Sequence, residues 1–138
     1  MLDIKFIREN PDIIKKTAKE KLVEIDVDRL LEVDKLVKEN LSEVEILRAE
    51  RNKLSNEIPT LQGEEKQEKI NTVRELKEKI SKIEEVLNPL QEEFDDLMLR
   101  VPAPTLPEVP VGESDADNVE IRKVGEIRKF NFTQKSHY

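Results

Sequence analysis

Apolar residues in the middle of the chain recur at alternating steps of three and four. The first ladder consists of Leu30, Val33, Val37, Asn40, Val44, Leu47, Arg51, Leu54 and Ile58. The second consists of Val73, Leu76, Ile80, Ile83, Leu87, Leu90, Phe94, Leu97 and Val101. Such steps return the side chain to one side of an α-helix, so each ladder forms a narrow apolar seam. The pattern predicts two long helices, over residues 28–58 and 64–101.

A short segment with Pro59 and Gly63 separates the ladders and predicts that the chain folds back on itself. The two seams then pack as an antiparallel coiled-coil hairpin. The favoured register pairs residues whose numbers add up to 127, for example Leu30 with Leu97. A slip of one heptad leaves Phe94 without an apolar partner, which disfavours that alternative.

Residues 1–24 predict a small helical cap on this hairpin. Asp3 and Asn10 are N-cap residues by type, and Pro11 suits a first helical turn. Asp26 or Asp28 is expected to cap the first long helix. The apolar stripe expected to be buried in the cap consists of Ile13, Ile14, Ala18 and Leu22.

Prolines mark the remaining boundaries. Pro59 is expected to push Ile58 out of the helical conformation and so end the first long helix. Pro89 lies at an outward position of the second helix and predicts a bend without a break. Residues 102–118 are rich in proline and predict an extended, semi-rigid connector.

The pattern changes again after the connector. Residues 119–124 alternate in polarity, as do Phe130 and Phe132, which predicts two short strands. Two such strands are no domain by themselves, so residues 119–138 are interpreted as the start of a further domain. The predicted fold class is all-α: a helical arm over residues 1–101, then the connector and an extended C-terminal tail.

Composition narrows the function classes. Of the 138 residues, 40% are charged and 4% are aromatic, which suits a thin seam better than a compact enzyme core. There is no cysteine, which excludes a disulfide framework and a cysteine nucleophile. The chain shows no apolar signal core and no stretch of membrane-spanning length, so a cytoplasmic protein with no membrane partner is expected.

Charge is unevenly distributed along the predicted hairpin. The net charge of −7 disfavours a nucleic-acid partner if taken alone. However, residues 48–82 carry nine Lys or Arg and seven Asp or Glu. Residues 27–47 and 83–101 together carry four Lys or Arg and twelve Asp or Glu. The outer half of the arm is therefore the part that can accept phosphate groups.

No catalytic residues and no metal ligands are predicted. Glycine-rich phosphate loops are missing, and His137 stands alone near the end of the sequence. Adjacent acidic pairs such as Glu84 and Glu85 are typical of solvated helix faces.

The basic residues of the outer half of the arm have two interpretations. Pairing within one helix, for instance Glu75 with Lys79 and Glu78 with Lys82, would make them ordinary surface charges. Contact with an RNA backbone would need only Lys and Arg at phosphate spacing. The candidate RNA-binding residues are Arg48, Lys53, Lys66, Lys69, Arg74 and Lys77.

Several segments, in order, resemble the N-terminal region of seryl-tRNA synthetases. They are residues 1–11, 47–55 with Ile58, 109–112, 117–122 with Gly125, and His137 with Tyr138. The resemblance spans nearly the whole chain, and the order and spacing around a hairpin are more specific than any single segment.

The resemblance implies a tRNA-binding arm that positions the long variable arm of serine tRNA, and usually also selenocysteine tRNA. It also implies a homodimeric enzyme that activates serine with ATP and Mg²⁺ in a class II catalytic domain absent from this chain, with no role for DNA. These residues alone would not aminoacylate tRNA. An alternative function is a free-standing coiled-coil hairpin that scaffolds proteins or acts as a chaperone clamp, which needs the heptads but neither the connector nor the strands.

Overall fold

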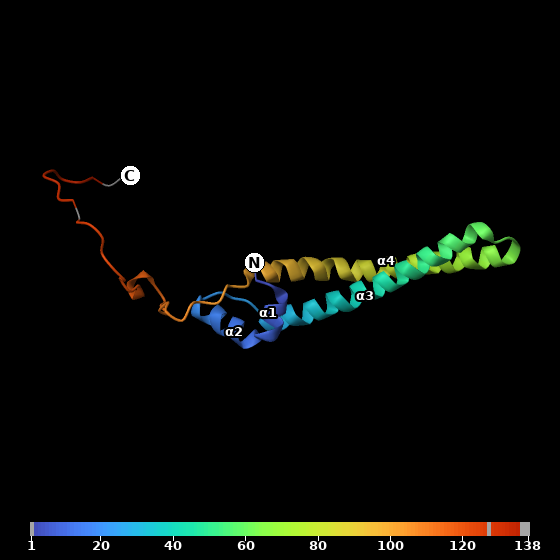
Figure 1. The fold of residues 1–138 in the computed structure, drawn as a ribbon, viewed down its shortest axis with the longest axis horizontal. Helices are drawn as coiled ribbons and strands as arrows, with labels where there is room; N and C mark the ends of the chain where they lie inside the picture. The colour runs from blue at the N-terminus through green and yellow to red at the C-terminus, as the bar shows by residue number, and fades with distance from the viewer. Residues whose placement is uncertain (1, 127, 136–138) are drawn as a thin grey trace. The chain divides into compact units, whose positions relative to one another are not determined.

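The computed structural model describes residues 2–126 and 128–135, and it is built from helices and irregular segments (Figure 1). The helices are α1 (Ile4–Glu9), α2 (Pro11–Glu20), α3 (Val27–Glu57), the 3₁₀ turn η1 (Ile58–Thr60), α4 (Gly63–Arg100) and the 3₁₀ turn η2 (Asp115–Asp117). The all-α prediction is confirmed. The chain divides into two compact units, Met1–Leu106 and Pro107–Tyr138. Within the described residues, no helix is both long and apolar enough to span a membrane.

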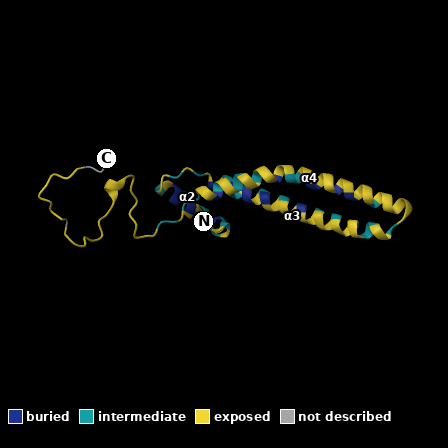
Figure 2. Ribbon diagram, turned by 90° about the horizontal axis from the view of Figure 1, so that it is seen from above, coloured by how far each residue is buried: buried dark blue, intermediate teal, exposed yellow. Residues whose placement is uncertain are grey.

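The long helices α3 and α4 run antiparallel, side by side, with η1 near their far end (Figure 1). Their 31 and 38 residues correspond to roughly 47 and 57 Å at 1.5 Å per residue. Every residue of the two predicted seams is buried or half-buried, while the outward positions of both helices are mostly exposed (Figure 2). The hairpin is thus held together by the two narrow seams.

Cross-helix ion pairs agree with the favoured register. Arg29 pairs with Glu93, and Arg48 with Glu84. The numbers of these pairs add up to 122 and 132, on either side of the predicted 127. Val33 belongs to a core cluster against which Phe94 packs, as that register requires.

The turn between the long helices differs from its prediction. Ile58 keeps helical angles, φ −54° and ψ −40°, although Pro59 follows it. The chain tightens into η1 instead, and the Leu61 amide donates to the Ile58 carbonyl at 3.2 Å. A proline at the start of a 3₁₀ turn lacks an N–H that the turn does not use, so the helix end needs no extended residue. Gly63 then adopts φ +66°, a left-handed angle that favours glycine.

Pro89 does not interrupt α4, which is continuous from Gly63 to Arg100. Its side chain is on the exposed side of the helix, as the heptad position predicts. One missing amide is tolerated because the seam residues Leu87 and Leu90 on either side stay buried or half-buried.

Local chemistry explains the two short helices of the cap. The Asp3 carboxylate caps α1 by accepting from the Lys5 amide at 2.8 Å. Asn10 does not cap α2 with its side-chain oxygen, contrary to prediction. Its backbone N–H and its Nδ2 both donate to the Phe6 carbonyl, at 2.9 and 3.1 Å, and so close the end of α1 instead. The preceding helix competes for this side chain because α1 ends where α2 begins.

The cap and the base of the hairpin share one core. Ile7, Ile14, Val27, Leu30 and Met98 form a cluster in which each side chain is at most 5% exposed. In the predicted cap stripe, Ile14 and Ala18 are buried, but Ile13 and Leu22 are 45% and 70% exposed. The stripe was assigned too broadly because α2 is only ten residues long and presents one narrow face to the hairpin.

Ion pairs fasten the cap to α3. Arg8 Nε donates to Asp34 Oδ2 and Arg8 Nη2 donates to Asp34 Oδ1, each at 2.7 Å, across 26 residues of sequence. This bidentate contact raises the pKa of Arg8, mainly through the hydrogen bond. Lys15 donates to Asp28 at 2.7 Å. Asp26, not Asp28, caps α3, by accepting from the Arg29 amide at 2.9 Å.

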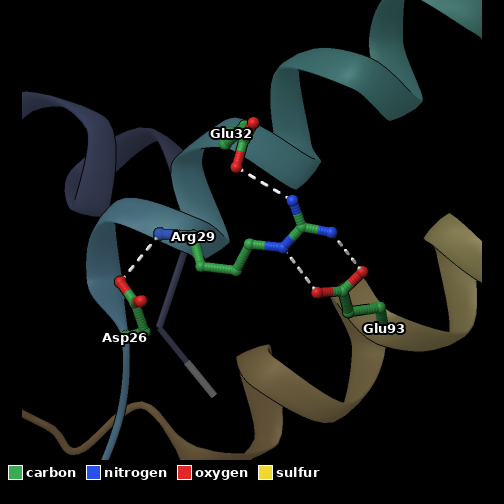
Figure 3. A network of polar contacts seen from close by, with 4 residues as sticks. All are labelled: Asp26, Arg29, Glu32 and Glu93. Atoms are coloured by element: carbon green, nitrogen blue, oxygen red, sulfur yellow. Dashed lines mark hydrogen bonds and ion pairs between the residues drawn. The ribbon is translucent and has the colours of Figure 1, made fainter.

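A second polar network closes the base of the hairpin (Figure 3). The Arg29 guanidinium donates to both Glu93 oxygens on α4, at 2.7 and 2.8 Å, and to Glu32 one turn along α3 at 2.9 Å. The hydrogen bond from Arg29 holds the pKa of Glu93 below its ordinary value of 4.5. This contact joins the two long helices by a planar fork, a geometry that lysine could not supply.

The Arg29–Glu93 pair predicts a pH dependence of stability. Because the folded pKa of Glu93 is lowered, its contribution is fully present above about pH 4.5 and is lost as pH falls through the lowered pKa. We expect Glu93→Gln to flatten the loss of stability between neutral and acid pH in urea titrations. The matched control is Glu92→Gln, since the neighbouring Glu92 has no ion pair in the described part of the chain. Equal flattening by both variants would contradict the assignment.

The second unit, Pro107–Tyr138, contains the 3₁₀ turn η2, around which Ser114 and Asp117 form a reciprocal capping box. Residues 119–124 form no strand, contrary to prediction, and Val119, Ile121 and Val124 are between 68% and 95% exposed. Phe130 and Phe132 likewise belong to no strand, contrary to prediction. Neither alternating segment has a ladder to join among the described residues, so the backbone stays irregular. The predicted boundaries of the connector, 102–118, and of the further domain stay predictions.

Candidate nucleic-acid interface

One flank of the hairpin is defined by an ion pair between the long helices. Arg48 of α3 donates to Glu84 of α4 at 2.6 Å. Residues seven apart lie along the same flank of a coiled coil, so this flank, the first flank, also contains further residues at that spacing. They are Leu41 and Ser55 on α3 and Ile70 and Lys77 on α4.

The other flank, the second flank, is defined in the same way. Arg29 and Glu93 join across it at 2.7 Å. Steps of seven place these residues with them: Leu36, Glu43, Glu50 and Glu57 on α3, and Glu65, Thr72, Lys79 and Val86 on α4. The second flank is therefore mostly acidic along its outer half, whereas the outer part of the first flank, from Arg48 to Lys77, has no carboxylate.

The structure separates the predicted RNA-binding residues. Arg48 lies on the first flank but is paired with Glu84. Lys69 is paired with Glu57, and its hydrogen bond lowers the pKa of that carboxyl. Lys53 comes three residues after Glu50 and four before Glu57, so it lies close to the second flank.

Arg74 and Lys77 are brought together. Both line a shallow hollow of about 440 Å³ at the far end of the arm. The other lining residues are Ile58, Gln67, Ile70, Asn71 and Val73. Lys66 lies one turn before Ile70 on the same helix. These three cations make no ion pair with the residues that the structure describes.

Ion pairs within one helix do not account for the basic residues of the outer half of the arm. The predicted pairs Glu75 with Lys79 and Glu78 with Lys82 do not reach ion-pair distance within the described ranges. Pairing explains Arg48 and Lys69 but not Arg74 and Lys77. The cations of the hollow thus remain available to an anionic ligand.

Three residues of the hollow were missed by sequence reasoning. Gln67, Ile70 and Asn71 carry no charge, so a pattern of phosphate-binding cations does not include them. A signal was present, since Ile70 lies seven residues before Lys77 and outside the seam. Ile70 is 39% exposed, and Gln67 donates to Asn71 at 3.4 Å, a weak bond.

Two other expectations concern metals and His137. Among the described residues, no group of three or more His, Cys, Asp or Glu is arranged to hold a metal ion. His137 and Tyr138 lie outside the described residues.

Comparison with known proteins identifies the family. The sequence model of the seryl-tRNA synthetase N-terminal domain matches residues 1–104. The chain belongs to the seryl-tRNA synthetase N-terminal domain family. The hairpin, cap and first flank described above all lie within the matched segment of this seryl-tRNA synthetase domain, which confirms the resemblance seen in the sequence.

Curated relatives of this seryl-tRNA synthetase domain are serine–tRNA ligases. A serine–tRNA ligase of Caldanaerobacter subterraneus subsp. tengcongensis is 42% identical over the whole chain, and one of Dictyoglomus turgidum is 39% identical over 99% of it. The chain covers 33% of each of these relatives, so it spans about a third of their length.

A solved structure resembles the fold of the seryl-tRNA synthetase domain. It is the crystal structure of seryl-tRNA synthetase from Pyrococcus horikoshii complexed with ATP. The TM-score is 0.68 at 36% identity, with 88% of this chain and 28% of that chain covered.

Proposed function

We propose that the hairpin is the tRNA-binding arm of a seryl-tRNA synthetase, and that it positions the long variable arm of serine tRNA through the first flank. The observation that carries this proposal is the hollow without carboxylates that Arg74 and Lys77 line at the outer part of the first flank. Double-helical RNA is bound mainly by shape and backbone contacts. A rod of roughly 50 Å with cations on one side of its outer half suits a projecting RNA stem.

The chemistry of the full-length protein is part of the proposal. Serine activation with ATP and Mg²⁺, and transfer to tRNA, would take place in a catalytic domain that starts with residues 119–138. The structure related to this chain was solved in complex with ATP, which supports that role for the longer protein. We also propose a cytoplasmic homodimer that accepts selenocysteine tRNA, as the resemblance implies.

The proposed function predicts dependence on the variable arm. Titration of the full-length protein with serine tRNA, at several salt concentrations, is expected to give salt-sensitive binding. The same tRNA without its variable arm is expected to bind at least about tenfold more weakly, a loss of roughly 1.4 kcal/mol. Equal binding of both RNAs would contradict the proposal, and absence of binding would favour the protein scaffold or chaperone clamp.

A further inference from the structure

The hollow beside Ile70 differs chemically from the other hollows of the hairpin. One hollow, where the hairpin meets the cap, is lined by Glu24, Asp26 and Asp28 as well as by basic residues. Another, along α3, is lined by Glu39 and Glu43. The hollow of Ile58, Gln67, Ile70, Asn71, Val73, Arg74 and Lys77 has cations, amides and an apolar floor but no carboxylate. Of these three hollows in the described residues, it alone is suited to an anionic ligand.

Phosphate groups do not account for all of this lining. A phosphate needs only cations and N–H donors, and it gains nothing from the exposed Ile70 side chain or from Val73, which also lines the hollow. The flat face of a base gains from apolar contact, and its edge has donors and acceptors that match carboxamides. Gln67 and Asn71 are bonded to each other only at 3.4 Å, so both amides have bonding capacity left.

We infer that this hollow binds one unstacked nucleoside of the tRNA, with Ile70 against the base, the amides of Gln67 and Asn71 at its edge, and Arg74 and Lys77 on the flanking phosphates. The inference rests on the proposed function and adds a base-contacting subsite to backbone recognition. Only a nucleotide outside the paired stems can present its face in this way. The arm would then detect one position of the tRNA as well as its shape.

Salt dependence separates the two kinds of contact. Removing a phosphate contact lowers the slope of log affinity against log salt by about 0.7 to 0.9, whereas removing a base contact lowers affinity at constant slope. In the full-length protein we expect Lys77→Ala to lower the slope. Ile70→Ala is expected to weaken serine tRNA binding about fivefold at unchanged slope, as for uncovering roughly 40 Å² of apolar surface. Asn71→Ala is expected to weaken it by a similar factor at unchanged slope, because it removes a hydrogen bond to the edge of the base.

Matched controls exist on the same helix. Val86→Ala removes an exposed aliphatic side chain from the second flank, and Asn88→Ala removes an exposed amide outside the hollow. Both are expected to bind serine tRNA like the unaltered protein. Alanine favours helix at all five substituted positions, so loss of folding is not expected.

Abasic serine tRNAs identify the nucleoside. Each unpaired nucleotide outside the anticodon loop is replaced in turn by an abasic one. An abasic replacement at one position is expected to weaken binding to the unaltered protein about fivefold. The same replacement is expected to cause no further loss of binding to the Ile70→Ala variant. If no abasic tRNA weakens binding, or if Ile70→Ala binds normally, the nucleoside subsite is overturned even when the variable arm is required. If the variable arm is not required, the proposed function fails together with the subsite.

Discussion

Reversing the charge of Arg74 and Lys77 in the full-length enzyme is expected to raise the KM for serine tRNA about 30-fold. Both side chains line the same hollow and make no ion pair with the described residues. Reversal turns attraction to phosphate into repulsion, which after screening by salt costs roughly 2 kcal/mol for the pair. Serine-dependent ATP–pyrophosphate exchange, which needs no tRNA, is expected to be unchanged.

The control for this experiment is Lys79→Glu combined with Lys82→Glu. It makes the same change in net charge on the same helix, but Lys79 belongs to the second flank, which also contains Glu43, Glu50 and Glu57 of α3. Its effect on the KM is expected to stay below about threefold, because electrostatics at a distance are screened within roughly 10 Å. Equal effects of the two double variants would show that only the overall charge of the arm matters.

Truncation of Leu30 to alanine is expected to lower the free energy of unfolding by about 3 kcal/mol. Leu30 is fully buried and belongs to the cluster that joins α1, α2 and both long helices through Ile7, Ile14, Val27 and Met98. The neighbours come from four helices, so they cannot all move to fill the cavity, and much of the lost packing is not recovered. Urea unfolding followed by circular dichroism at 222 nm measures the change.

Leu41→Ala is the matched control for Leu30→Ala. Leu41 lies on the same helix, but it is 37% exposed and outside the seam. Its truncation is expected to cost less than about 1 kcal/mol, because exposed side chains leave little cavity. If both variants lost equal stability, the core shared by the cap and the hairpin would not be the main source of stability at the base.

The helical hairpin was predictable because its signal is periodic and long. Each seam repeats over several heptads, so a single exception such as Asn40 or Arg51 does not obscure the pattern, and both of these residues are half-buried as predicted. The cap was less predictable, since ten residues of α2 contain too few turns to show which side faces the hairpin. Ile13 and Ile14 are adjacent and equally apolar, yet only Ile14 is buried.

The candidate site was predicted only in part. The basic residues of the distal arm can be counted in the sequence, but the side of the hairpin on which each one lies depends on how the two seams face each other. The contacts of Arg48 with Glu84 and of Arg29 with Glu93 distinguish the two flanks. Arg74 and Lys77 lie one turn apart on α4, and the ion pairs place Lys77 on the first flank with Arg48, whereas Lys53 lies close to Glu50 and Glu57 of the second flank.

The amino-acid sequence was sufficient for the architecture of the arm, its register and the location of positive charge in its outer half, because these follow from the spacing along each helix and from matching the two seams. The same spacing puts Gln67, Ile70, Asn71 and Arg74 on one side of α4. Folding was needed to pair Arg48 and Lys69 with acidic partners and to bring Ile58 to that side of α4 in one hollow. Ion pairs across the hairpin and the shape of its tip depend on two helices meeting through η1. Heptad spacing within either helix carries no information about that meeting.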